Sequence, residues 1–157
     1  ISAALSLNGT VFKGSKNMAG EAGLSLFQNH EKLQDLAGLS GLHKKLPELS
    51  DEFWHGKSEA IDLVLVDREN FKILQKAMNL AAIALANIAS FMDPDELVIY
   101  STIFSEDNQL WKMLENEFAS CRGKQGLGPA TLKNAGSTEL TPAVGAAIFA
   151  LENTYAC

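Results

Sequence analysis

One long apolar helix constrains the fold of this chain more than any other feature of the sequence. Asp67 is a good N-cap residue, and Asp93-Pro94-Asp95 ends the pattern because proline cannot continue a helix. Between these points apolar residues recur at alternating spacings of three and four: Phe71, Leu74, Met78, Ala81, Leu85, Ile88 and Met92. Further apolar residues, many of them alanine, widen this stripe. We therefore expect a helix that is buried over most of its circumference and that a partner approaches closely.

We expect this helix to lie inside a globular domain rather than to span a membrane. Its longest apolar stretch, from Ala77 to Met92, would be about 24 Å long as a helix, shorter than a hydrocarbon core of about 30 Å. Asn79 and Asn87 also interrupt the stretch. The sequence therefore predicts no membrane contact.

The composition indicates one domain in a reducing compartment. A chain of 157 residues, of which 46% are hydrophobic, can bury about two-thirds of its unfolded surface. Its formal net charge is −6 and it has no basic run, so we expect no contact between this chain and nucleic acid. Cys121 and Cys157 are too few for a disulfide framework and suit a cytoplasmic protein. The first residue is Ile1, with no signal-peptide pattern after it, and we expect a piece of a longer protein.

The N-terminal residues predict a β-hairpin followed by a glycine-rich loop. Apolar and small residues alternate from Ile1 to Leu7, as in a strand. Asn8-Gly9 is the strongest two-residue hairpin signal, because both residues tolerate positive φ, and Thr10 to Lys13 returns as the second strand. Residues 14–23 then form a loop that contains Gly14, Gly20 and Gly23.

The rest of the chain predicts an α/β arrangement. The expected elements are short helices at 31–39 and 42–49, a strand at 97–100, a helix capped by Ser105, a strand at 131–133 and a helix from Thr141 to about Tyr155. The strand at 97–100 is a continuous apolar run, typical of a central parallel strand. Helices and strands in alternation predict an α/β layer with the hairpin beside it.

Three stretches carry a resemblance to a known family. The first is the opening, Ile1-Ser-Ala-Ala-Leu-Ser-Leu-Asn-Gly-Thr-Val-Phe-Lys-Gly14 followed by Met18-Ala-Gly-Glu-Ala-Gly23. The other two read Leu85-Ala-Asn-Ile-Ala-Ser-Phe-Met-Asp-Pro-Asp-Glu-Leu-Val-Ile99 and Pro142-Ala-Val-Gly-Ala-Ala147. In order and spacing they resemble the ROK family of repressors, open reading frames and sugar kinases. The resemblance implies an α/β fold that is part of an actin-like (ribonuclease H-like) ATPase fold, with an N-terminal hairpin, then helices and a short mixed sheet. It also implies that residues 1–157 form one C-terminal domain, about two-thirds of such a protein, without its N-terminal lobe.

The chain departs from the family's motifs at several positions. Leu24 stands where the family has a zinc-binding histidine, and no cysteine precedes Cys121 although the family has a cysteine cluster there. An aliphatic side chain cannot bind Zn²⁺. Tyr100-Ser101-Thr102 stands where the family's kinases have a run of glycines beside the nucleotide. The family's phosphate loop and catalytic Asp correspond to positions upstream of Ile1, so we predict no catalytic residue, no metal site and no cofactor in this chain.

The same resemblance makes Glu21 the candidate ligand-binding residue, with Gly20 beside it. The family's corresponding Glu contacts sugar hydroxyls. A carboxylate on a rigid, glycine-flanked turn is a suitable acceptor for such groups, since hydrogen bonds to a charged acceptor are the stronger ones. The predicted ligand is a small sugar or a sugar phosphate. A solvated loop acid is the alternative interpretation of Glu21.

The other candidate residues favour structural interpretations. His30, His43 and His55 lie twelve or more residues apart, which is no ligand spacing on a helix. Ser101 has no evident base partner to make it a nucleophile. The segment from Gly123 to Gly128 lacks the residue order of a phosphate-binding loop, so we interpret it as a connector.

Two hypotheses for the function follow. The first is the sugar-effector-binding or dimerisation portion of a bacterial, cytoplasmic, ROK-like transcriptional regulator, not enzymatic in this chain and assembled as a homodimer. The alternative is the C-terminal part of a ROK sugar kinase, which phosphorylates hexoses with ATP. The departures at Leu24 and at Tyr100 to Thr102 favour the first hypothesis.

We predict that the protein binds no structural zinc. The ligand positions of the family are Leu24 and a segment without cysteine, so the loop after Glu21 is expected to be held by apolar packing of Leu24, Leu26 and Phe27. Elemental analysis of the purified protein should find zinc far below stoichiometry. Stoichiometric zinc that survives dialysis would contradict the prediction.

Overall fold

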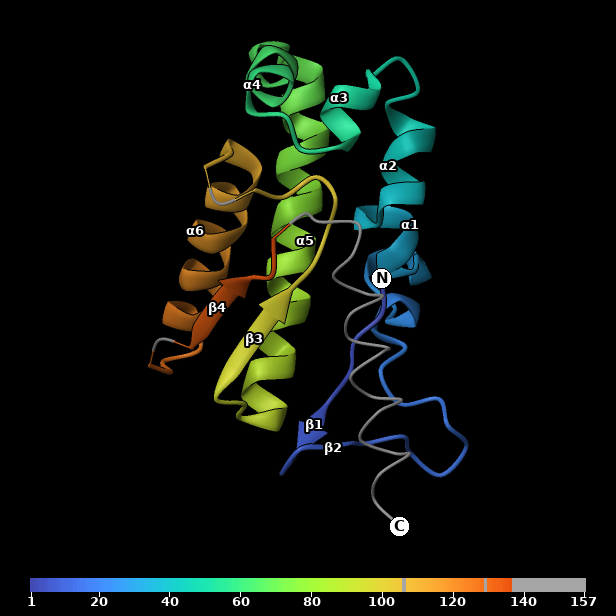
Figure 1. Ribbon diagram of the computed structural model, residues 1–157, viewed down its shortest axis with the longest axis vertical. Helices are drawn as coiled ribbons and strands as arrows, with labels where there is room; N and C mark the ends of the chain where they lie inside the picture. The colour runs from blue at the N-terminus through green and yellow to red at the C-terminus, as the bar shows by residue number, and fades with distance from the viewer. Residues whose placement is uncertain (106, 129, 137–157) are drawn as a thin grey trace.

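The computed structural model describes residues 1–105, 107–128 and 130–136 (Figure 1). In chain order its elements are β1 Ser6–Leu7, β2 Thr10–Val11, the 3-10 helices η1 Ala22–Leu24 and η2 Gln28–His30, α1 Leu33–Ala37, α2 Leu39–Lys45, α3 Asp51–Trp54, α4 Ser58–Val66, α5 Arg68–Met92, β3 Glu96–Ile99, α6 Gln109–Lys124 and β4 Thr131–Asn134. The chain is therefore of the α/β class. In the described part its strands form two separate two-stranded sheets, one antiparallel and one parallel, rather than one mixed sheet.

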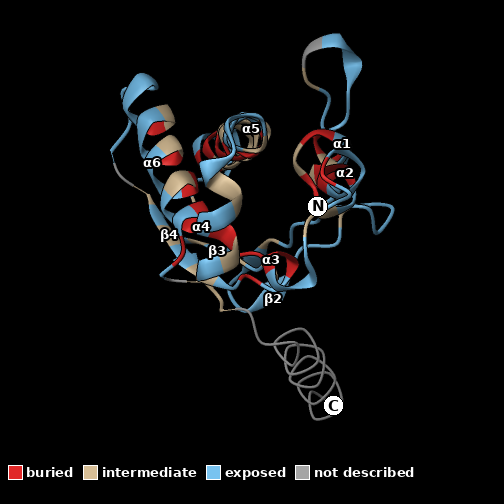
Figure 2. Ribbon diagram, turned by 90° about the horizontal axis from the view of Figure 1, so that it is seen from above, coloured by how far each residue is buried: buried red, intermediate tan, exposed pale blue. Residues whose placement is uncertain are grey.

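Helix α5 is the central element, and its ends are where the sequence predicts them. The Asp67 carboxylate accepts hydrogen bonds from the backbone N–H groups of Glu69 (3.0 Å) and Asn70 (2.8 Å), as an N-cap does. Asp93 ends the helix in the left-handed conformation, with φ of 44°. α5 lies between α6 on one side and α1 and α2 on the other (Figures 1 and 2).

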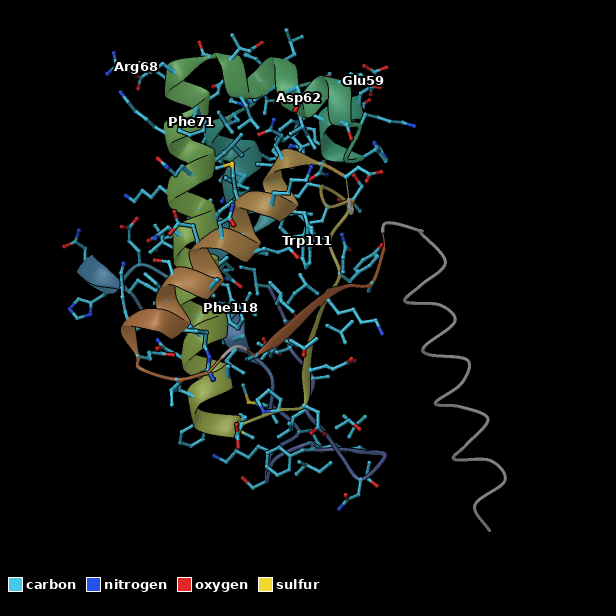
Figure 3. The ribbon with its side chains drawn as sticks, turned by 90° about the vertical axis from the view of Figure 1, so that its left-hand side faces the viewer. Glu59, Asp62, Arg68, Phe71, Trp111 and Phe118 are labelled. Carbon is cyan, nitrogen blue, oxygen red and sulfur yellow. The ribbon has the colours of Figure 1, made fainter. Side chains whose placement is uncertain are left out.

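The core lies where α5 and α6 face each other. The buried residues of α5 form one stripe, Leu74, Ala77, Met78, Ala82, Ala86 and Ala89. α6 presents larger side chains to it, including Leu110, Trp111, Leu114 and Phe118. Figure 2 shows the buried positions of the two helices on their facing sides, and Figure 3 labels Trp111 and Phe118 on α6. Small residues on one helix and large ones on the other allow the two to pack closely.

One prediction about α5 was wrong. It is not buried over most of its circumference, because only the stripe described above is buried and Phe91 is 87% exposed. The length estimate above covered Ala77 to Met92 alone, and the full helix of 25 residues is long and apolar enough to cross a membrane. Its contacts with α1, α4 and α6 nevertheless place it as the core helix of this fold.

The hairpin is confirmed, but it is shorter than predicted. Asn8 and Gly9 have φ of 50° and 77°, the two positive values that a type I′ turn requires. The strands are Ser6–Leu7 and Thr10–Val11, with Ser6 opposite Val11 and Leu7 opposite Thr10. One further backbone hydrogen bond, from the Phe12 N–H to the Leu5 carbonyl (2.8 Å), extends the pairing. The apolar side chains of the hairpin are exposed rather than buried in a core, so packing does little to stabilise longer strands. These side chains are Leu7, Val11 and Phe12.

The β3–α6–β4 unit confirms the predicted parallel pairing. Glu96 to Ile99 pair in register with Thr131 to Asn134. Burial alternates along both strands between exposed and half-buried, so within the described residues β3 has one face on the core and one face open, unlike the central strand that was predicted.

Helix α6 begins three residues later than predicted, because its N-cap is Asn108 and not Ser105. Asn108 is 1% exposed. Its carbonyl Oδ1 accepts a hydrogen bond from the Trp111 N–H (3.0 Å), and its Nδ2 donates to the Ile103 carbonyl (2.8 Å). Asn108 thus joins the helix end to the loop before it, which a serine side chain at position 105 does not do.

The segment between residues 25 and 66 forms more, and shorter, helices than predicted. The helix expected at 31–39 is α1, and the helix expected at 42–49 starts earlier, as α2, and ends at Lys45. Two further helices, α3 and α4, were not predicted. The helix expected from Thr141 lies outside the described residues.

We predict that Asn108→Ala destabilises the protein by about 2 kcal/mol, because it removes a buried cap and leaves the Ile103 carbonyl without its donor. Ser105→Ala should change the free energy of unfolding by less than about 0.5 kcal/mol. Urea unfolding of both variants measures the difference. An equal loss of unfolding free energy in the two variants would contradict the assignment of Asn108 as the N-cap.

Candidate functional site

The turn that carries the predicted ligand residues is fixed by backbone contacts with the first residues of the chain. The Gly20 carbonyl accepts hydrogen bonds from the N–H groups of Ala3 (2.7 Å) and Ala22 (2.7 Å). The Gly23 N–H donates to the Ile1 carbonyl (3.0 Å). Gly20 has φ of 92°, and a Cβ there would overlap the Ala3 carbonyl oxygen. Position 20 therefore requires glycine, because its φ is positive and because there is no room for a side chain.

Glu21 lies at the start of the 3-10 helix η1, with its side chain exposed. Its backbone carbonyl accepts the Leu24 N–H (3.0 Å), which closes the turn. In the described part of the chain the carboxylate makes no cap hydrogen bond or ion pair, so its oxygens are available to a ligand. The geometry is that of a free acceptor on a rigid support.

The predicted apolar packing of the following loop was wrong in part. Leu24 and Leu26 are 42% and 60% exposed, and only Phe27 is half-buried. Backbone pairing holds the loop instead: Leu26 forms an isolated antiparallel bridge with Lys32, and the Leu33 N–H donates to the Ser25 carbonyl (2.9 Å). Such bonds do not depend on the identity of the side chain at position 24.

A second candidate region is the carboxyl edge of the parallel strands β3 and β4. The Ala135 N–H donates to the Ile99 carbonyl (2.9 Å), which continues the pairing past the strand ends. Gly136 follows with φ of 78°. Ligands of open α/β sheets bind outside the carboxyl ends of the strands, so this edge is a second position to consider for a ligand.

Asn134 at this edge was not identified from the sequence. Its Oδ1 accepts the Gly136 N–H (2.9 Å), while its Nδ2 is buried without an acceptor among the described residues. A buried donor that lacks a partner is costly unless something else satisfies it. Only the strand register, which brings Asn134 level with Ile99, reveals its position.

The loop from Tyr100 to Asn108 leaves the same edge and is well anchored. Asn108 holds the Ile103 carbonyl, and Phe104 packs edge-on against Trp111 with ring centroids 5.6 Å apart. The Phe104 N–H donates to the Ser101 carbonyl (3.2 Å). No His, Asp or Glu in the described residues forms a hydrogen bond with Ser101, so nothing marks it as a nucleophile.

The histidines do not form a site within the part of the chain that the structure describes. No cluster of three or more potential metal ligands occurs there. His43 stacks on Trp54 with ring centroids 3.6 Å apart, and His55 Nδ1 lies 2.7 Å from the Asp51 carbonyl oxygen. Both are local structural contacts.

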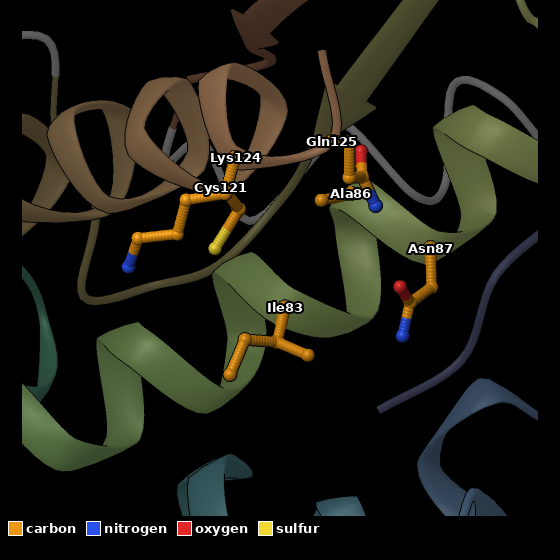
Figure 4. A pocket seen from close by; sticks show the side chains of 6 residues that line it. All are labelled: Ile83, Ala86, Asn87, Cys121, Lys124 and Gln125. Carbon is orange, nitrogen blue, oxygen red and sulfur yellow. The ribbon is translucent and has the colours of Figure 1, made fainter. Parts of the chain in front are cut away.

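Two cavities adjoin α6. One of about 180 Å³ lies between α5 and α6 and is lined by the six residues that Figure 4 labels, among them Cys121 and Lys124. A second of about 430 Å³ lies between α6 and β4. Neither contains Glu21 or the residues of the strand edge.

The turn and the strand edge lie on different sides of α5. The N-terminus, to which the turn is hydrogen-bonded, lies on the side of α1 and α2, whereas β3 and β4 lie on the side of α6 (Figures 1 and 2). Gly20 and Glu21 therefore lie apart from the strand edge, on the other side of α5.

Comparison of the sequence with protein-family models and with curated proteins finds no match. The structure, by contrast, is similar to solved structures. A ROK hexokinase from Thermus thermophilus matches with a TM-score of 0.76 and 18% identity, over 98% of this chain and 54% of that chain. A protein from Cytophaga hutchinsonii ATCC 33406 assigned as a sugar kinase matches with a TM-score of 0.62 and 13% identity, over 94% of this chain and 53% of that chain.

These matches confirm the resemblance to the ROK family at the level of the fold. The chain spans about half the length of the structures it matches. The prediction that the protein is not an enzyme is contradicted, because both neighbours are sugar kinases by description. That prediction gave weight to Leu24 and Tyr100, which are 42% and 39% exposed and on which this fold does not depend.

We predict that Gly20→Ala destabilises the protein by more than about 2 kcal/mol, because the new Cβ meets the Ala3 carbonyl at a φ that disfavours alanine. Gly123→Ala is the matched control, since a Cβ there meets nothing within 4 Å inside helix α6. It should be neutral or stabilising by about 0.5–1 kcal/mol. Urea unfolding measures both, and equal stability of the two variants would show that the turn is not tightly held.

Proposed function

We propose that this chain is part of a sugar kinase that transfers a phosphoryl group from ATP to a hexose. The observation that carries the proposal is the match of nearly the whole chain to a ROK hexokinase, with a TM-score of 0.76 over 98% of its residues. At 18% identity this match establishes the fold, and a fold alone does not determine an activity. The geometry of the Gly20-Glu21 turn adds support that is independent of overall similarity.

In this proposal Glu21 accepts hydrogen bonds from sugar hydroxyls. Its carboxylate is exposed, and it stands on a turn whose shape is set by Gly20 and Gly23 rather than by the ligand. A preformed acceptor binds a sugar without first having to be ordered. The sugar would lie between this turn and the half of the kinase that the chain does not span, so both parts are needed for full affinity.

The carboxyl edge of β3 and β4 is the proposed nucleotide side of the protein. By the resemblance to the family's kinases, the nucleotide would lie beside the strand that ends at Ile99. The open edge there is bounded by Gly136 and by the loop that Asn108 anchors. Tyr100 to Thr102 replace the glycine run of the family's kinases, so the nucleotide would pass a wall of side chains. The phosphate loop and the catalytic Asp would come from the remaining half.

The regulator hypothesis has no observation of its own in its favour. Its basis was the loss of family motifs, and the structural neighbours are kinases rather than repressors. A globular, cytoplasmic protein that forms homodimers is compatible with the kinase proposal, and we retain those expectations as part of it.

The test is ATP-dependent phosphorylation of a panel of hexoses by the full-length protein. We expect turnover of at least one hexose above a protein-free blank. Glu21→Gln should raise the KM for that hexose about tenfold, since one lost charged hydrogen bond corresponds to about 1.4 kcal/mol. The KM for ATP should stay within about twofold.

Glu31→Gln is the control, because Glu31 is an exposed acid close by in sequence that the proposal does not use. It should leave both KM values unchanged. Absence of hexose phosphorylation across the panel would refute the kinase proposal. Activity with an unchanged KM in Glu21→Gln would refute only the role of Glu21.

A further inference from the structure

Arg122, in the last turn of α6, is a buried cation that has no buried anion as a partner among the residues that the structure describes. Its side chain is 8% exposed. No carboxylate of the described residues lies within 4.0 Å of it. Buried charges are normally paired, because an unpaired one loses its hydration without compensation. The negative end of the α6 dipole offsets part of this cost, but it supplies no counter-ion.

The hydrogen bonds of Arg122 are made to neutral oxygens. Nη1 donates to the Ser90 hydroxyl (3.2 Å) and Nη2 to the Gly128 carbonyl (3.2 Å). Ser90 in turn bonds to Gln125 (2.8 Å), which Figure 4 labels at the end of α6. Nε is buried with no acceptor in the described part of the chain. The bonds from Nη1 and Nη2 join α5, α6 and the loop after α6, which is a structural role. This role does not explain why Nε has no acceptor or why a positive charge is buried here.

Arg122 also lines the larger cavity beside α6. That cavity has a volume of about 430 Å³, within the usual range of small-molecule sites. Its walls are otherwise mainly apolar, with Phe118 (Figure 3), Leu127 and Leu132 among them. Sites for small organic anions commonly combine apolar walls with one cationic side chain that binds the acidic group, and this cavity has both.

Glu115 also lines this cavity. It is two helical turns before Arg122, about 10 Å along the axis of α6. The Glu115 carboxylate would repel a ligand that has negative charge at both ends, so we expect such a ligand to bind weakly. A ligand with one acidic end and an apolar body avoids that repulsion.

We propose that this cavity binds a small organic anion, whose phosphate or carboxylate group meets Arg122 and whose apolar body lies on Phe118 and Leu127. The site is at the amino edge of β4, on the opposite end of α6 from Asn108 and the strand edge described above. Fourteen residues of helix, about 21 Å, separate Asn108 from Arg122. The proposal does not depend on the kinase activity.

The test is a titration of the ¹⁵N-labelled full chain, followed through the backbone amide signals of Gly123 and Gly128 at constant ionic strength. Phenyl phosphate and benzoate are the probes, and they distinguish a phosphate ligand from a carboxylate ligand. Inorganic phosphate tests the contribution of the apolar wall, and benzyl alcohol tests that of the charge.

We expect saturable shifts of these amide signals with at least one aromatic anion, with a Kd below about 10 mM. Inorganic phosphate should bind at least about tenfold more weakly, and benzyl alcohol should cause no saturable shift.

Arg122→Gln should weaken the binding at least about tenfold, whereas Lys124→Gln, an exposed cation in the same turn, should change it less than about twofold. Ala119→Phe provides a second variant that leaves Arg122 intact, because Ala119 is exposed and lines the cavity. It should abolish the binding even if Arg122→Gln fails to fold. No saturable shift with either aromatic anion, or equal binding in wild type and Ala119→Phe, would overturn the proposal.

Discussion

The packing of α6 onto the alanine stripe of α5 is the contact on which the rest of the structure depends. The buried residues of α5 include the small Ala82, Ala86 and Ala89, whereas α6 buries larger side chains such as Trp111 and Phe118, so the two helix axes can approach closely. Because α6 carries the β3–α6–β4 unit, the same contact places the parallel strands against α5. It also brings Ser90 and Arg122 together at the far ends of the helices. One interface thus sets the sheet, the strand edge and the cavity.

The N-terminal turn depends on a different kind of interaction. Its residues contribute little to the core, and its shape comes from backbone hydrogen bonds to Ile1 and Ala3 that require glycine at position 20. This separation has a functional consequence. A ligand acceptor on a turn held by backbone hydrogen bonds does not depend on the surrounding side chains, whereas the position of the strand edge depends on how α6 packs on α5. Because the two regions are held by different contacts, we expect the effects of mutations in them to be additive.

Features set by a few neighbouring residues could be predicted from the sequence. Asn8-Gly9 predicted the hairpin because positive φ is a local property, and Asp67 predicted the start of α5 because a cap reaches only its own first turn. The start of α6 could not be chosen in this way, since Ser105 and Asn108 are both good caps. The choice depends on the Ile103 carbonyl, which only the folded loop brings to Asn108. For the same reason Asn134 and the surroundings of Arg122 were beyond sequence analysis.

The positions at which this chain departs from the family's motifs bear on which ligands it can bind, and they do not determine its fold. Leu24 and Tyr100 are exposed, so a different residue at either position leaves the backbone path unchanged. Gly20 and Asn108 are different, because the backbone around them has no alternative way to satisfy its space or its hydrogen bonds. The match to a hexokinase over 98% of this chain at 18% identity likewise shows that one fold accommodates different residues at most positions. Side chains that the fold requires are constrained by packing and hydrogen bonds, whereas exposed side chains are free to change and decide what a site on this fold can bind.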